Sequence, residues 1–75
     1  MFEEFKQFLV DEHRINPEAI TLEAELAGDL GINSLELADL VYTCEERFDI
    51  MIDDDELHKF RTVGDVVAYL EKTVK

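Results

Sequence analysis

The chain has 75 residues, of which 19 are acidic and seven are basic, and its formal net charge is −12. A charge of this size and sign argues against nucleic acid and anionic membranes as partners and favours proteins with basic faces. Because 47% of the residues are hydrophobic, the chain is too apolar to be disordered, and its length suits one domain over residues 1–75 with a modest core.

The cysteine content and the first residues indicate the compartment. Cys44 is the only cysteine, which excludes an internal disulfide and favours a reducing environment. The first ten residues, MFEEFKQFLV, lack the basic stretch and apolar run of a signal peptide, and no segment approaches the length of a membrane span. We therefore expect a cytoplasmic protein with no membrane span.

The first predicted helix runs from Phe2 to about His13. Apolar side chains recur there at helical spacing, with charged residues between them: Phe2, Phe5, Phe8 and Leu9. Residues 14–33 are then predicted to form a long loop, because they contain the only proline and two glycines. Its interrupted apolar residues would pin it onto a core: Ile15, Ile20, Leu22, Leu26, Leu30 and Ile32. Loops of this length are uncommon unless they are functional.

A second helix is predicted from Ser34 to Phe48. Asn33 can cap its N-terminus, and Glu36 stands three residues later, as in a capping box. The apolar stripe of this helix consists of Leu37, Leu40, Val41, Cys44 and Phe48. Because Cys44 lies on the stripe, we interpret it as a buried core residue rather than a reactive thiol.

Two further helices complete the predicted fold. Asp53 is expected to cap a short helix that ends near Lys59, since acids suit the positive end of a helix. Thr62 and Asp65 open the last helix, whose apolar face comprises Val63, Val66, Val67, Leu70 and Val74. The fold class is therefore all-α, a small four-helix bundle with three main helices, one short helix and a long first loop.

Ser34 is the first candidate for chemistry. In the segment DLGINSL, residues 29–35, a turn containing glycine delivers Ser34 to the first turn of a helix, where its hydroxyl should face solvent. Free backbone N–H groups and the positive end of the helix dipole suit a covalently attached phosphate there. The alternative is that Ser34 only helps to begin the helix, as serines often do.

Three segments together resemble the acyl carrier protein family. The family hallmark, Asp-Leu-Gly followed by two residues and Ser-Leu, is DLGINSL here. Residues 37–57, LADLVYTCEERFDIMIDDDEL, are similar to the acidic second helix and the loop after it. Residues 60–70, FRTVGDVVAYL, resemble the Thr-Val-Gly-Asp start of the last helix. The matches cover nearly the whole chain.

The resemblance implies that 4'-phosphopantetheine is joined to Ser34 by a phosphodiester, supplied from coenzyme A by a separate phosphopantetheinyl transferase. The thiol of this arm would carry acyl chains as thioesters in type II fatty acid biosynthesis, with a polyketide or aminoacyl pathway as the alternative. No general base is placed to activate Ser34, so we expect a substrate of acyl-processing enzymes and not an enzyme. We also expect the protein to be a monomer. An acidic structural or regulatory paralogue without the arm is the other alternative.

The sequence departs from the family pattern next to this serine. Asn33 stands where the family usually has aspartate. Asparagine caps a helix as well as aspartate does, but it cannot supply a full negative charge to a magnesium ion or a basic group of the transferase, which bears on loading. Asp49 and Asp53 replace a usual glycine and proline, changes that we expect to affect a loop and not the chemistry.

Acidic residues gather after Ser34, opposed there only by Arg47 and Lys59. They are Glu36, Asp39, Glu45, Glu46, Asp49, Asp53, Asp54, Asp55 and Glu56. Given the resemblance, we interpret this region as a docking surface for basic patches of partner enzymes, and the alternative is a solvated helix face. The predicted partner-binding residues are Leu35, Glu36, Asp39, Tyr42, Glu45 and Glu46, with Leu35 and Tyr42 as exposed anchors.

The remaining candidate groups receive structural interpretations. The acids at 53–56 lack the spacing of a calcium-binding loop, so we expect weak cation binding and no dedicated metal site. His13 and His58 have no second ligand nearby and are interpreted as surface residues. In this family the acyl chain can shelter between the helices. The expected lining residues, which plain core packing would explain equally well, are Leu37, Leu40, Val41, Val63 and Val67.

Overall fold

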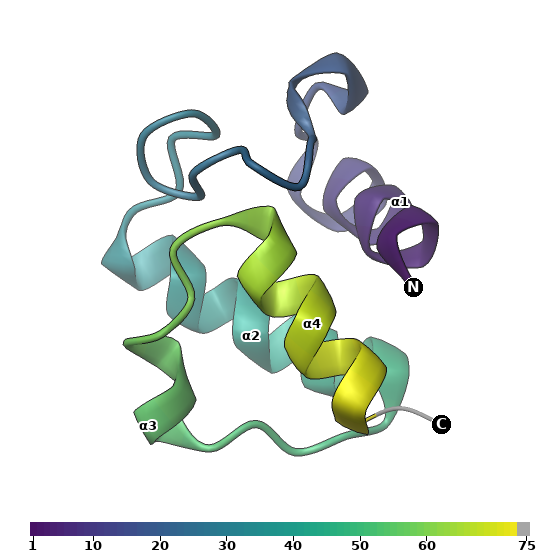
Figure 1. Ribbon diagram of the computed structural model, residues 1–75, viewed down its shortest axis with the longest axis vertical. Coiled ribbons are helices and arrows are strands. Elements are labelled where there is room, and N and C mark those ends of the chain that lie inside the picture. The colour runs from purple at the N-terminus through teal and green to yellow at the C-terminus, as the bar shows by residue number, and fades with distance from the viewer. Residues whose placement is uncertain (74–75) are drawn as a thin grey trace.

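The structure, a computed structural model, describes residues 1–73 and consists of helices joined by loops (Figure 1). The elements in chain order are α1 (Phe2–His13), the 3-10 helix η1 (Pro17–Ala19), α2 (Ser34–Phe48), α3 (Asp54–Leu57) and α4 (Val63–Thr73). The predicted all-α architecture with three main helices, one short helix and a long first loop is confirmed. Val74, which we assigned to the apolar face of the last helix, lies outside the described residues.

The core lies between α1, α2 and α4. α1 contacts both other helices, and α4 lies in front of α2 in Figure 1. The Phe8 ring is central, because its centroid is 5.9 Å from that of Phe5 and 6.0 Å from that of Phe48. Large side chains that are fully buried come from all three helices: Phe5, Phe8, Leu9, Leu40, Cys44, Val63, Val66 and Leu70. The helical periodicity of the sequence thus corresponds to the buried faces.

The loop over residues 14–33 is fixed to this core by side chains and by backbone. Ile20, Leu26 and Ile32 are buried as predicted, whereas Leu22 remains 46% exposed. Three N–H···O bonds of 2.9 Å join the loop to the start of α4: from Val63 to Ala24, from Gly64 to Leu22 and from Leu26 to Arg61. Since buried backbone groups need partners, these bonds allow an irregular segment to cover the core.

α3 is shorter than predicted. It ends at Leu57 and not near Lys59, and the Asp53 side chain, predicted as its cap, makes no capping hydrogen bond. The Lys59 N–H instead donates to the Glu56 carbonyl at 2.9 Å, three residues back, so the chain tightens. Phe60 is then buried, which returns the chain to the core.

The start of α4 has the predicted capping box in both directions. The Thr62 Oγ1 accepts a hydrogen bond from the Asp65 N–H at 3.2 Å, and the Asp65 Oδ2 accepts from the Thr62 N–H at 3.1 Å. The same carboxylate oxygen also accepts from the Arg61 N–H at 3.0 Å. These backbone donors, first from Arg61 and then from Thr62, hold the pKa of Asp65 below its ordinary value.

Candidate functional site

Ser34 is the first residue of α2, and its side chain is exposed. Asn33 caps the helix as predicted, since its Oδ1 accepts from the Glu36 N–H at 2.8 Å. The capping box is only half formed, because within residues 1–73 no bond returns from the Glu36 side chain to the Asn33 N–H. In the same part of the chain the backbone N–H groups of Ser34 and Leu35 have no partner, as expected at a helix start.

The turn before Ser34 is built by the Asp-Leu-Gly segment. The Asp29 Oδ2 accepts from the Glu25 N–H at 2.8 Å, and the Asp29 N–H donates to the Glu25 carbonyl at 2.9 Å. Gly31 has a φ of 69°, a left-handed conformation that glycine adopts without strain. The Ile32 N–H then donates to the Leu26 carbonyl at 2.8 Å. This turn fixes the position at which Ser34 begins α2. Sequence analysis missed that Asp29 holds the turn together, because the spacing of Asp29 from Glu25 does not by itself reveal their hydrogen bonds.

A hollow of about 390 Å³ lies beside Ser34. Its lining includes Leu26, Ile32, Ser34, Leu37, Phe60 and Arg61. Of the residues expected to shelter an acyl chain, only Leu37 lines this hollow. The others pack in the core: Leu40, Val41, Val63 and Val67. Where an acyl chain would lie stays a prediction, because helical periodicity identifies a buried face without separating packed core from the wall of a hollow.

Comparison with known proteins decides the family. The family model described as "Phosphopantetheine attachment site" matches residues 3–70. The acyl carrier protein of Wolinella succinogenes is 42% identical over 71 residues, which cover 95% of this chain and 93% of that protein. The acyl carrier proteins of Thermotoga maritima and Amoebophilus asiaticus are 40% and 47% identical, over 96% and 85% of this chain and 89% and 80% of their own lengths.

The chain belongs to the acyl carrier protein family. Its cofactor is therefore phosphopantetheine, and the geometry around the helix start fits such a group. Ser34 is the only serine in the chain, its side chain is exposed, and two backbone N–H groups beside it are free to face a phosphate. The hollow beside it offers apolar side chains to a flexible arm.

One exposed stripe of α2 alternates apolar and acidic side chains. Leu35, Asp39, Tyr42 and Glu46 are spaced by four, three and four residues, so they lie along one side of the helix, and all four are exposed. Leu35 and Tyr42 are 82% and 61% exposed, as predicted for anchors. We call these four residues the α2 stripe. Glu36 is also exposed, next to it at the start of the helix.

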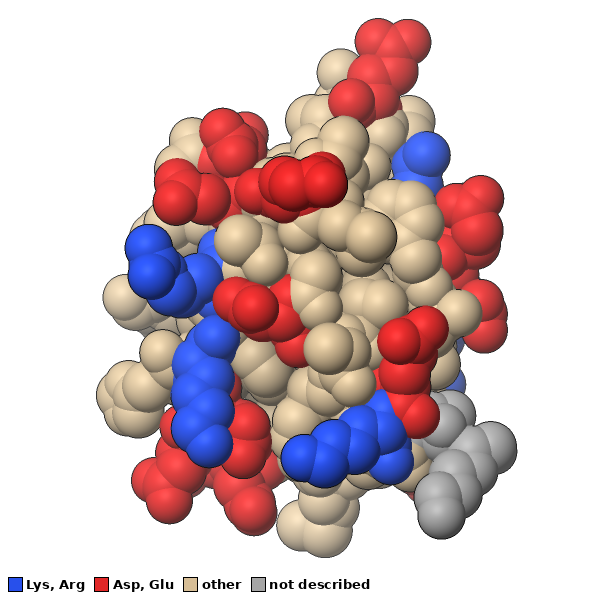
Figure 2. Space-filling model, in the orientation of Figure 1, with Lys and Arg blue, Asp and Glu red and all other residues tan. Residues whose placement is uncertain are grey.

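Glu45 differs from the other predicted partner-binding acids. Its side chain is half-buried, and its Oε2 accepts a hydrogen bond of 2.7 Å from the Ile52 N–H in the loop between α2 and α3. Arg47, the one basic residue of α2, has its Nη2 3.9 Å from the Asp11 Oδ2 on α1. Figure 2 shows other acids gathered over α3 at the lower left, beside a basic side chain. Glu45 and Arg47 thus contact other elements, whereas the α2 stripe remains exposed.

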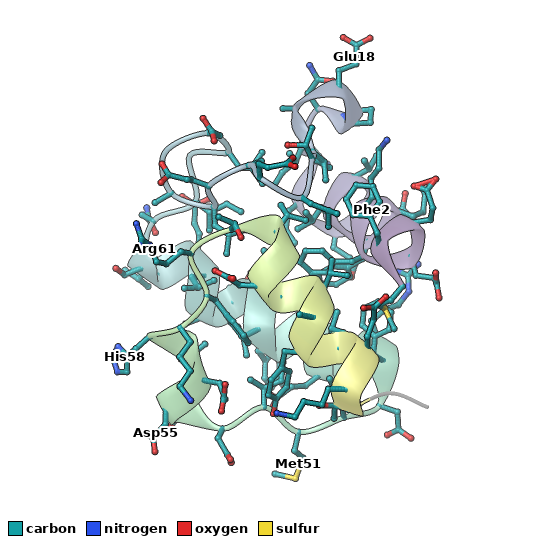
Figure 3. The ribbon with its side chains drawn as sticks, in the orientation of Figure 1. Phe2, Glu18, Met51, Asp55, His58 and Arg61 are labelled. Carbon is teal, nitrogen blue, oxygen red and sulfur yellow. The ribbon has the colours of Figure 1, made fainter. Side chains whose placement is uncertain are left out.

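Cys44 and the two histidines lie apart from Ser34. Cys44 is fully buried as predicted, and burial, followed by the charge of Glu45, raises the pKa of its thiol to about 12. His58 is exposed, and Figure 3 shows it pointing outward. The surface interpretation of His13 was wrong: it is half-buried, with its ring 5.5 Å from that of Phe8 and its Nε2 3.3 Å from the Thr43 Oγ1.

The described residues hold no cluster of three or more histidine, cysteine, aspartate or glutamate side chains arranged to bind a metal ion. The acids at 53–56 belong to α3 and its flank, and they do not converge on one point. No helix within residues 1–73 has the length and apolar character needed to cross a membrane.

Proposed function

We propose that this chain is the acyl carrier of type II fatty acid biosynthesis and that Ser34 carries its phosphopantetheine arm. The observation that supports the site is the exposed Ser34 hydroxyl at the N-terminus of α2, within a segment that the family model covers. The group supplies a thiol that holds an acyl chain as a thioester. The chain's own residues present the hydroxyl, fix its position through the Asn33 cap and the Gly31 turn, and offer the hollow.

Loading needs an external catalyst. Within residues 1–73 no hydrogen bond joins the Ser34 side chain to a carboxylate or an imidazole, so a transferase would remove the hydroxyl proton. The Ser34 oxygen forms the new bond to phosphorus, and adenosine 3',5'-bisphosphate leaves from coenzyme A. We propose that the chain is a substrate of such enzymes, a monomeric carrier domain over residues 1–75 that works in the cytoplasm.

The partners proposed for this carrier are the transferase and acyl-processing enzymes with basic docking patches. The α2 stripe supports this proposal, because two exposed apolar side chains stand between acids on one side of a helix. Apolar anchors supply contact energy, and the surrounding charges steer the encounter. Glu36 adjoins the stripe at the end nearest Ser34, so docking there would bring a partner close to the arm.

Intact-protein mass tests the proposal. Incubation with coenzyme A, magnesium and a phosphopantetheinyl transferase should add one phosphopantetheine, and Ser34→Ala should abolish the addition. Thr21→Ala, which also removes an exposed hydroxyl from the first half of the chain, is the matched control and should load normally. Loading of Ser34→Ala, or no loading of the wild type by several transferases, would remove the assignment.

Asn33 supports one alternative. Its cap bond of 2.8 Å forms without a charged side chain, so the fold can be kept in a paralogue that is never loaded and acts as an acidic structural or regulatory subunit. A polyketide or aminoacyl pathway remains the alternative for a loaded carrier. The same mass experiment separates the unloaded subunit from a carrier, and identification of the acyl group bound after expression separates the pathways.

A further inference from the structure

The loop between α2 and α3, residues 49–53, is held from two helices. The Ile52 N–H donates to the Glu45 Oε2 on α2 at 2.7 Å. On the other side, the Tyr69 hydroxyl of α4 donates to the Met51 carbonyl at 3.5 Å, a long and weak bond. Two consecutive residues of a short loop are therefore restrained through their backbone atoms, strongly at Ile52 and weakly at Met51.

Along this loop the apolar side chains alternate between the core and solvent. Ile50 is half-buried and Ile52 is 8% exposed, and both pack against the core. Met51, between them, is 86% exposed, and Figure 3 shows its side chain pointing away from the molecule. A large apolar side chain displayed on restrained backbone contributes nothing to the core, but it can enter an apolar socket without first losing loop freedom.

Met51 lies beside the C-terminal half of α2. The hydrogen bond from the Ile52 N–H holds the loop against Glu45. Glu45 immediately precedes Glu46, the last residue of the α2 stripe. Exposed aspartates flank Met51 in the chain, Asp49 on one side and Asp53 on the other. A partner surface that fits this apolar tip between two acids is an apolar socket bordered by lysine or arginine.

We propose that Met51 is a further docking anchor, which enters a basic-rimmed apolar socket on enzymes that dock on the α2 stripe, and that Glu45 is a positioning residue which holds Met51 in place. The proposal rests on the proposed carrier function. In this proposal Glu45 acts by holding the loop through its hydrogen bond to the Ile52 N–H, and not by attracting a partner through its charge. Methionine suits such an anchor, because its flexible, polarisable side chain adapts to irregular sockets.

The first experiment measures loading kinetics with a phosphopantetheinyl transferase and coenzyme A as the probe. Met51→Gln keeps the side-chain length but removes its apolar character, and it should raise the KM for the carrier about tenfold, as loss of a modest hot spot does, with kcat and Tm unchanged. Leu22→Gln is the matched control, because Leu22 is exposed near the opposite end of α4. An unchanged KM for Met51→Gln, or equal increases for both variants, would overturn the proposal.

The second experiment separates positioning from charge. Glu45→Gln keeps an oxygen that can accept from the Ile52 N–H, so it should retain most of the affinity. Glu45→Ala removes the acceptor and should raise KM and speed hydrogen exchange of the Ile52 amide. The double variant Glu45→Ala with Met51→Gln should be no worse than Met51→Gln alone, because Glu45 acts through Met51.

Each failure has its own signature. If both Glu45 variants raise KM equally and without faster exchange at Ile52, Glu45 acts by its charge and the positioning role is wrong. If the wild type gains no phosphopantetheine, the proposed function fails. If it loads normally while the Met51 and Glu45 variants match it in KM, the carrier function stands and only the anchor is lost.

Discussion

The backbone N–H of Gly64 donates a 2.9 Å hydrogen bond to the Leu22 carbonyl, and this contact leaves no room for a side chain on Gly64. A Cβ built on residue 64 would lie 2.9 Å from that same oxygen, closer than real Cβ contacts allow. The first turn of α4 and the long loop therefore approach each other only because residue 64 is glycine.

Gly64→Ala should lower the free energy of unfolding by about 1–3 kcal/mol, because the backbone of the loop or the helix must shift. The helix propensity of alanine, better than that of glycine by about 1 kcal/mol, acts in the opposite direction and is outweighed. Gly28→Ala is the control: its Cβ would meet only the tip of the Glu25 side chain, at 2.7 Å, which can rotate away. Chemical denaturation giving equal stability for both variants would contradict the steric argument.

Asp65 should make α4 sensitive to acid. Since backbone N–H donors lower its pKa in the folded state, its charged form contributes stability above the unfolded pKa of about 3.9, and this contribution is lost as the pH falls through the folded value. The free energy of unfolding of the wild type should exceed that of Asp65→Asn at pH 6, and the difference should shrink below pH 4. Asp55→Asn, at an exposed acid of α3, should show no such convergence. A difference that is constant from pH 6 to pH 3 would show that the charge of Asp65 is irrelevant.

Cys44 should not react with a maleimide in the folded chain before loading. Its side chain is fully buried and its thiol has a pKa of about 12, so little reactive thiolate is accessible at neutral pH. After loading, one fast-reacting thiol should appear, that of the arm, and it should also appear in Cys44→Ala. Rapid labelling of the folded, unloaded chain would show that the helices open around Cys44.

Asn33→Asp should leave the Tm nearly unchanged, because the two side chains are comparable caps, although one more negative charge adds slight repulsion. Loading should respond more strongly. If a carboxylate here helps to hold magnesium, transfer to the aspartate variant will be faster at limiting magnesium, and the difference will diminish as magnesium is raised. Equal rates across the titration would make Asn33 a cap and nothing more.

Asp39→Lys should weaken the association of the loaded carrier with an acyl-processing enzyme, chiefly by lowering the association rate constant, and Glu36→Lys should act in the same direction. Added salt should weaken wild-type binding as well. Glu71→Lys makes the same charge change at an exposed position of α4 and serves as the control. If the three variants bind alike and salt has no effect, the acids near Ser34 form a solvated face.

The sequence by itself determined the features that depend on local signals. The limits of α1 and α2, the Asn33 cap, the Thr62 and Asp65 box and the burial of Cys44 follow from helical periodicity and from side chains that bond to their own backbone neighbours. The exposure of Ser34, Leu35 and Tyr42 follows too, because positions off an apolar stripe face solvent.

Only the tertiary structure decided which of these groups meet across the chain. Glu45 accepts a hydrogen bond from Ile52, seven residues away, and His13 packs against Thr43, thirty residues away. Leu22 and Gly64 also meet through a backbone hydrogen bond, although they are far apart in the sequence. α3 ends at Leu57, and Phe60 is buried in the core soon after it. Such contacts depend on how the helices and the loop pack against one another. The hydrophobic periodicity of a single element carries no information about which other elements it will contact.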